Sequence, residues 1–204
     1  MSQRNLHRPL LLAFVAFSLA GCKSQPALQH GTIYEPAAQA PPIPLETTDG
    51  SSFSLEQVRG KTALVYFGYT HCPDFCPATL ATLDWMLDQI GDRSDHVQVV
   101  FVSVDPERDT PEVLQRYLDA FRPGIIGLTG DLATLKETVE GYGAFASTTH
   151  ELHTEVEPGV VVHSTRLFVI DADGRLLANY AFDVDRQDLL DDLSGLLAAT
   201  AGSS

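Results

Sequence analysis

From about residue 44 onward, apolar residues alternate between continuous runs and helical spacing. Residues 62–69 and 97–104 are nearly continuous apolar runs, the pattern of strands that are buried on both faces of a sheet. Between and after these runs, apolar residues return every three or four positions, as they do along one face of a helix. The three helical stripes are Leu80, Leu83, Leu87 and Ile90; Leu114, Tyr117, Leu118 and Phe121; and Leu132, Leu135, Val139 and Tyr142. This part of the chain therefore predicts strands and helices in alternation.

The remaining pattern predicts the fold class. A short strand is expected at 125–128, a hairpin with strands at 166–170 and 176–181, and a last helix from about 186 to 199. Strand and helix units followed by a hairpin and a helix predict an α/β fold with a central mixed β-sheet flanked by helices, in the thioredoxin-like order. Ligand sites in such sheets tend to lie beyond the carboxyl ends of the central strands.

Length and charge limit the number of domains and the class of partner. The chain has 204 residues, of which 44% are hydrophobic, so we expect one compact domain at 44–199 followed by a short tail at 200–204. With 13 basic and 27 acidic residues, the formal net charge is -14. Such a surface repels phosphate backbones, and we therefore expect no nucleic-acid partner.

The N-terminus has the layout of a secretory signal. Within residues 1–21, two arginines precede an uncharged apolar run, and the run ends in Leu19-Ala20-Gly21-Cys22. This ending resembles the bacterial lipobox, whose cysteine becomes the lipid-bearing first residue of the mature protein; the alternative is an uncleaved anchor with an incidental cysteine. Residues 22–43 are rich in Ala, Pro and Gln and are expected to form a flexible tether. The domain would then be exported and anchored by lipid to a bacterial membrane, facing the periplasm or another extracytoplasmic space.

Two cysteines remain for chemistry, Cys72 and Cys76, directly after the first buried run. Three residues separate them, rather than the two of a thioredoxin redox motif. If both lay on one helix, their Cβ atoms would be about 5 to 6 Å apart, a gap that a metal bridges more easily than a disulfide does. A helix N-terminus would also favour the thiolate form. The spacing favours a metal site and leaves redox chemistry and a structural disulfide as alternatives.

A third ligand is sought among the histidines. His163 follows three valines and precedes the predicted strand at 166, so it is expected where an apolar segment emerges beside the sheet. On spacing alone, a histidine in that position is more often a hydrogen-bonded structural residue than a ligand. The histidines expected to be solvated, in the tether, in a loop or in a polar stretch, are His30, His96, His150 and His153.

Three segments resemble the motifs of the Sco/SenC family of copper-binding proteins: residues 67–77 (FGYTHCPDFCP), 103–111 (SVDPERDTP) and 162–164 (VHS). The resemblance covers roughly residues 44–199. It implies that Cys72 and Cys76 are the copper thiolates and that His163 is the imidazole ligand, with one copper ion per chain. Thiolates suit Cu(I), and an added imidazole lets the same site hold Cu(II).

Two further residues have an expected place. By analogy with the family, Asp105 would lie near the copper, where it accepts a hydrogen bond from a ligand or presents a charge to a partner. The alternative is that Asp105 and Pro106 simply build the turn before the next helix, and the sequence favours neither. Met86 falls within the first helical stripe and is expected in the core rather than on the metal.

The resemblance implies a role in assembling the dinuclear copper centre of cytochrome c oxidase. One hypothesis is a metallochaperone that delivers copper to the copper-bearing subunit of the oxidase and has no turnover of its own. The alternative is an enzyme, a thiol–disulfide oxidoreductase in which Cys72 and Cys76 reduce the cysteines of the recipient site. Other copper chaperones and thiol reductases are further candidate partners, and the membrane is one through the lipid on Cys22.

Overall fold

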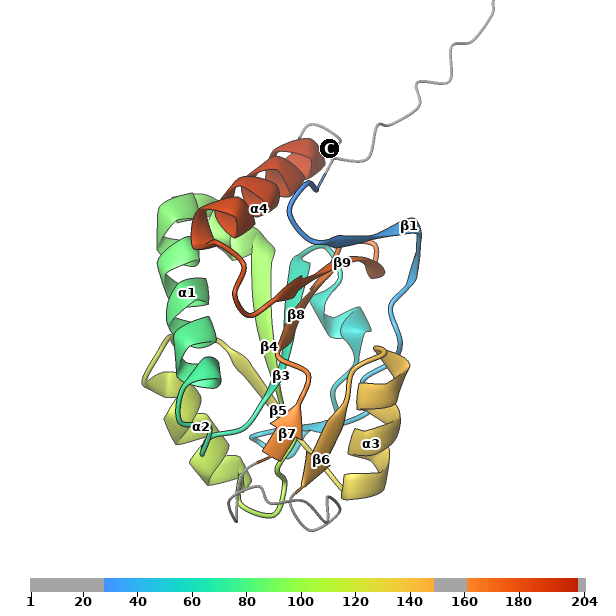
Figure 1. Cartoon of the computed structure of the whole chain (residues 1–204), viewed down its shortest axis with the longest axis vertical. Coiled ribbons are helices and arrows are strands. Elements are labelled where there is room, and N and C mark those ends of the chain that lie inside the picture. Colours follow the sequence, from blue (N-terminus) through green and yellow to red (C-terminus); the bar gives the residue numbers. More distant parts are fainter. Residues whose placement is uncertain (1–27, 149–160, 202–204) are drawn as a thin grey trace, which may run out of the picture.

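The computed structural model describes residues 28–148 and 161–201 of the chain (Figure 1). Within these residues, a seven-stranded sheet has the strand order β1-β9-β8-β3-β4-β5-β2, and β6 and β7 form a separate two-stranded sheet. The strands are β1 Thr32–Gln39, β2 Glu46–Thr47, β3 Thr62–Gly68, β4 Val97–Ser103, β5 Ile126–Thr129, β6 Ala146–Thr148, β7 Val161–His163, β8 Arg166–Ile170 and β9 Arg175–Ala181. The helices are η1 Leu55–Val58, α1 Phe75–Ile90, η2 Gly91–His96, α2 Pro111–Asp119, α3 Leu132–Gly141 and α4 Arg186–Ala201.

The centre of the sheet is mixed, as the sequence predicts. β3 pairs in parallel with β4 along its whole length, from Thr62 opposite Val97 to Gly68 opposite Ser103, and antiparallel with β8 on its other side. Every residue of β3 is buried, because helices cover both faces of the sheet. Figure 1 shows α1, α2 and α4 on one side of the sheet and α3 on the other. The predicted α/β, thioredoxin-like class is confirmed.

The helical stripes also lie where they are expected. Leu80, Leu83 and Ile90 of α1 are buried, and α1 packs against α4. Met86 is fully buried in the same stripe, which confirms it as a core residue. No helix among the described residues is long and apolar enough to cross a membrane.

The sheet begins earlier in the chain than the sequence predicts. Residues 32–39, which fall within the tether expected at 22–43, form β1 and pair antiparallel with β9. Their alternation is weak because β1 is an edge strand with few buried side chains. The strand that pairs with them lies far along the chain, with Thr32 opposite Asn179, 147 positions later, and no local pattern reveals such a pairing.

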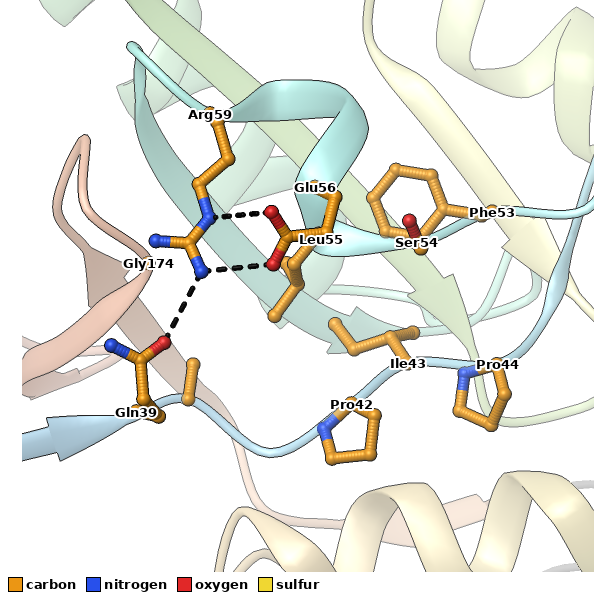
Figure 2. Close-up of a pocket in the computed structure, with 11 residues that line it drawn as sticks. Gln39, Pro42, Ile43, Pro44, Phe53, Ser54, Leu55, Glu56, Arg59 and Gly174 are labelled. Carbon is orange, nitrogen blue, oxygen red and sulfur yellow. Dashed lines mark hydrogen bonds and ion pairs between the residues drawn. The ribbon is translucent and has the colours of Figure 1, made fainter.

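A polar cluster holds the C-terminal end of β1, at Gln39. Arg59, which follows η1, donates to both oxygens of Glu56 at 3.1 and 2.8 Å and to Gln39 at 3.2 Å (Figure 2). Gly174 lies beneath this guanidinium with φ of 74°, where an added Cβ would meet Arg59 at 2.6 Å. The hollow in Figure 2 contains none of the predicted site residues. This cluster joins β1 to the fold and has no part in the thiol site.

We use the term N-terminal clasp for the contacts of Gln29, His30 and Tyr180 with the carboxylate of Asp192 in α4. The backbone N–H groups of Gln29 and His30 donate to this carboxylate at 3.0 Å, the Tyr180 hydroxyl donates at 2.7 Å, and His30 Nδ1 lies 3.1 Å away. Burial raises the pKa of Asp192, but these hydrogen bonds outweigh it and hold the pKa below its ordinary value. His30, expected to be solvated, is thus part of a built contact.

The N-terminal clasp predicts a specific loss of stability. Asp192→Ala should lower the free energy of unfolding by about 2 to 3 kcal/mol, because it leaves a buried hydroxyl and two amides without their charged acceptor. A carboxyl whose pKa is depressed by folding stabilises the fold above its unfolded pKa of about 4 and loses that effect as the pH falls through the folded pKa. Denaturant unfolding at pH 7 and pH 3 should therefore show a smaller difference in unfolding free energy between wild type and variant at pH 3.

The control is Asp188→Ala, because Asp188 is the more exposed carboxylate that contacts His30. This change should lower the free energy of unfolding by about 1 kcal/mol or less. An equal loss of stability in both variants would contradict the N-terminal clasp.

Candidate metal centre

The candidate site lies in the loop that joins β3 to α1. Pro73 disfavours a helical conformation at Cys72, so the helix cannot begin there, and α1 begins at Phe75. Pro77 is accommodated because the first turn of a helix needs no N–H from that position. Cys72 therefore lies in the loop, whereas Cys76 lies in the first turn of α1.

This placement changes the argument drawn from the cysteine spacing. Only Cys76 is helical, whereas the prediction from the spacing requires both cysteines on one helix. The two residues meet through a different contact, in which the backbone N–H of Cys76 donates to Cys72 Sγ at 3.4 Å. The helical spacing therefore does not favour a metal over a disulfide, and no disulfide joins Cys72 and Cys76 in this structure.

Both thiols are buried: Cys72 is 7% exposed and Cys76 is fully enclosed. The hydroxyl of Tyr66, on β3, donates to Cys76 Sγ at 3.7 Å. Burial is the main cause that raises the pKa of Cys76 to about 12, and the nearby Cys72 sulfur raises it further. The helix N-terminus, expected to favour a thiolate, is thus outweighed at Cys76 by loss of solvent. The thiol of Cys76 is protonated at neutral pH.

His163 is the last residue of β7, where its backbone lies opposite Ala146 of β6. Directly after it, the N–H of Ser164 donates to the carbonyl of Phe145 at 2.6 Å, which fixes the end of the small sheet. In Figure 1, β7 and the start of α1 both lie toward the lower end of the view. The side chain of His163 lies outside the described part of the structure, so its role as third ligand stays a prediction.

Asp105 is 4% exposed, just beyond the carboxyl end of β4. Its carboxylate accepts a hydrogen bond from Arg108, whose guanidinium lies 5.9 Å from the ring centre of Tyr69. Tyr69 lies in the loop between β3 and α1, residues 69–74, which we call the thiol loop. Burial raises the pKa of Asp105, although Arg108 acts against this. Asp105 therefore lies close to the thiol loop through Arg108 and Tyr69, while both of its predicted roles stay open.

Asp109 is a site residue that the sequence pattern does not single out. The cap of α2 is Thr110, whose hydroxyl accepts from the N–H of Val113 at 3.4 Å. Asp109 is completely buried and accepts from the N–H of Thr70 at 3.0 Å, from the Thr70 hydroxyl at 2.6 Å and from the Ser103 hydroxyl at 2.6 Å. It thereby ties the thiol loop to the end of β4. The one available signal was a second aspartate four positions after Asp105 within the same motif.

His71, Asp105 and Asp109 place ligand-type atoms within 4.8 Å of one another. His71 Nδ1 lies 3.0 Å from the Thr70 hydroxyl and 3.7 Å from Asp109. Because both oxygens of Asp109 already accept hydrogen bonds, this group holds the loop rather than offering a set of open ligands. His96 is exposed at the end of η2, whereas Cys22, His150 and His153 lie outside the described residues.

The family model described as SCO1/SenC matches residues 33–198. The mitochondrial protein SCO2 of Saccharomyces cerevisiae is 35% identical over 162 residues, which are 78% of this chain and 53% of that protein, so the chain spans about half the length of this relative. Among solved structures, copper-bound ScoI of Bradyrhizobium japonicum is similar with a TM-score of 0.66 and 32% identity over 77% of this chain and 98% of that one. Apo Sco1 of Thermus thermophilus is similar with a TM-score of 0.70 and 35% identity, over 83% of this chain and 95% of that one.

The buried carboxylate of Asp109 predicts a coupled loss of stability and of thiol protection. Asp109→Ala should lower the free energy of unfolding by about 3 kcal/mol, because an amide and two hydroxyls lose a charged acceptor. Since the same contacts hold the loop before Cys72, alkylation of Cys76 in the folded variant should become faster. Denaturant unfolding and mass-spectrometric alkylation rates measure the two effects. Asp92→Ala, at an exposed position in η2, should change neither, and unaltered alkylation in Asp109→Ala would show that the loop does not depend on this residue.

Proposed function

This chain belongs to the SCO1/SenC family, and from that membership we propose that it binds one copper ion with Cys72, Cys76 and His163 and takes part in assembling the copper centre of cytochrome c oxidase. Similar structures from Bradyrhizobium japonicum, Arabidopsis thaliana and yeast are described with copper bound. The Sco family is described as one of cytochrome c oxidase assembly proteins. These descriptions concern the relatives, and the residues of this chain supply the argument for its own site.

The observation that carries the proposal is the pair of buried cysteines, Cys72 and Cys76, beyond the end of the central strand. The Cys76 N–H contact with Cys72 Sγ shows that the loop already brings the two residues together. Soft sulfur donors in a site with little water suit Cu(I), and the imidazole of His163 would let the site also hold Cu(II). The donor set therefore fits copper better than it fits hard cations such as Mg²⁺ or Ca²⁺.

Copper in this proposal is a cargo that displaces protons. Because the pKa of Cys76 is raised to about 12, binding of the ion at neutral pH must release the proton of that thiol. The affinity for copper is then lower at acidic pH than at alkaline pH. Any group that returns a proton to Cys76 correspondingly promotes the release of copper.

Of the two roles, we propose delivery of copper, and the enclosure of Cys76 supports that choice. A dithiol enzyme attacks through a thiolate, and Cys76 is enclosed and protonated at neutral pH. This observation makes Cys76 a poor nucleophile and a suitable enclosed ligand, so a reductase would have to attack through Cys72. The oxidoreductase remains the second candidate, because Cys72 and Cys76 are close enough to contact each other in the reduced state.

The proposal includes an extracytoplasmic location. The lipobox-like ending at Cys22 supports a lipid anchor in a bacterial membrane, with the copper-binding domain in the periplasm or an equivalent space. The copper-bearing subunit of the oxidase is the proposed recipient, and the net charge of -14 suits a basic surface on that partner.

The copper site predicts both a stoichiometry and a ligand set. The soluble domain should bind one copper ion, and Cys72→Ala, Cys76→Ala and His163→Ala should each weaken Cu(II) binding by more than the roughly 10- to 100-fold that follows loss of a hydrogen-bonding partner of a ligand. Cu(I) binding should partly survive His163→Ala, since two thiolates can hold this ion. Competition titrations with optical detection measure both ions. His96→Ala, His150→Ala and His153→Ala are the matched controls, and Cu(II) uptake at wild-type affinity in His163→Ala would refute the three-ligand site.

Oxidase activity in a complementation assay distinguishes a copper carrier from a thiol reductase. A carrier needs all its ligands at once, whereas a reductase needs both thiols and tolerates loss of the imidazole with a rate penalty on the order of 10²-fold. In a strain that lacks the native protein, under limiting copper, His163→Ala should fail as badly as Cys76→Ser, and added copper should restore oxidase activity partly in both. Normal oxidase activity with His163→Ala, beside a Cys76→Ser strain that copper does not rescue, would favour the reductase.

A further inference from the structure

Two exposed aromatic rings lie beside the enclosed thiols. Phe75, the first residue of α1, is 41% exposed, and Phe182, which follows β9, is 50% exposed. Their ring centres are 4.5 Å apart, so the two side chains form one apolar surface. Large side chains of this kind cost free energy in water, and among the described residues only four large apolar side chains are this exposed. Two of the four thus meet next to Cys76.

A small hollow opens beside Phe182. We call it the Phe182 groove; its lining is mixed, with Leu83, Leu167, Val184 and Leu189 beside Tyr66 and three threonines. Tyr66 is the link to the thiols, since its hydroxyl donates to Cys76 Sγ at 3.7 Å. A side chain that entered the Phe182 groove would therefore lie one residue away from a copper ligand.

The rim of this surface is acidic. Asp74 directly precedes Phe75, and Asp183 and Asp185 follow Phe182; all three are exposed. The nearest basic residue in sequence, Arg186, lies with its guanidinium 4.4 Å from the ring centre of Trp85. An apolar centre within a polar, charged rim is the usual composition of a protein–protein interface.

We propose that Phe75, Phe182 and the Phe182 groove are the docking surface for the protein that receives copper, which presents an apolar side chain surrounded by Lys or Arg. This inference rests on the proposed function. The acidic rim selects the occupant: a second copy of this chain would bring the same carboxylates against it, and an anionic lipid surface would be repelled, whereas a basic partner is attracted. Docking here brings the recipient next to the ligand that is otherwise most enclosed.

The test measures association separately from copper binding. The soluble copper-bearing domain of the oxidase subunit is titrated by calorimetry into the apo and the copper-loaded forms of this protein. Phe182→Ala should weaken association about tenfold or more, while leaving the affinity for copper within about twofold of wild type. The matched control is Leu132→Ala, at the start of α3 on the other side of the sheet, where a similarly exposed (47%) apolar side chain is removed and no change is expected.

A charge variant tests the rim independently. Asp183→Lys should weaken association, and added salt should weaken the wild-type complex more than that of the variant. The docking surface is refuted if Phe182→Ala associates like Leu132→Ala, if Asp183→Lys binds more tightly, or if wild type does not associate with the domain in either form. It is also refuted if sedimentation shows a wild-type dimer that Phe182→Ala dissolves, because the occupant is then a second copy. Failure of wild type to bind copper refutes the proposed function instead, and the apo titration still reports on the surface.

Discussion

The arrangement of the thiol loop depends on the buried carboxylate of Asp109. Parallel pairing of β3 and β4 brings the carboxyl ends of both strands to one edge of the sheet, where the N–H of Val104 donates to the carbonyl of Gly68 at 2.8 Å. From that edge the chain leads in one case to Cys72 and in the other to α2. Asp109 accepts from Thr70 on the first path and from Ser103 on the second, and its charge is compensated by those donors. The position of Cys72 is thereby fixed by the sheet rather than by the helix that follows.

Burial, more than the helix terminus, determines the chemistry of the second cysteine. Cys76 lies where a helix N-terminus would favour a thiolate, yet its enclosure beneath Tyr66 keeps a proton on the sulfur. Such a thiol is a slow nucleophile and is poorly accessible to oxidants. A metal that carries its own positive charge restores the balance, since it replaces the proton in a place from which water is excluded. The enclosure of Cys76 thus supports the proposed role as a copper ligand, and a disulfide reaction at this site would have to begin at Cys72.

The sequence was sufficient for the features that depend on local pattern. Continuous apolar runs predicted β3 and β4, and helical spacing predicted α1, α2 and α3, because buried positions along a strand or helix show up as a regular spacing of apolar residues. Contacts between distant segments produce no such spacing. The pairing of β1 with β9 and the acceptor role of Asp109 depend on partners far along the chain or on another strand. The start of α1 after Cys72 was likewise decided by Pro73 together with the loop contacts, which the spacing of two cysteines does not show.

The N-terminal clasp has a mechanical consequence. Because Asp192 holds Gln29 and His30 against α4, the chain joins this domain at a fixed point, and Figure 1 shows that end of β1 beside α4, away from the start of α1. With a lipid on Cys22, only about seven residues would separate the membrane from the clasp, a leash of at most about 25 Å when fully stretched. The domain would then stand close over the bilayer with its thiol end directed outward. Under the proposed lipid anchor, this short stretch and the length of the domain would set how far from the membrane the thiol end lies, and so the height at which a recipient must present its copper site.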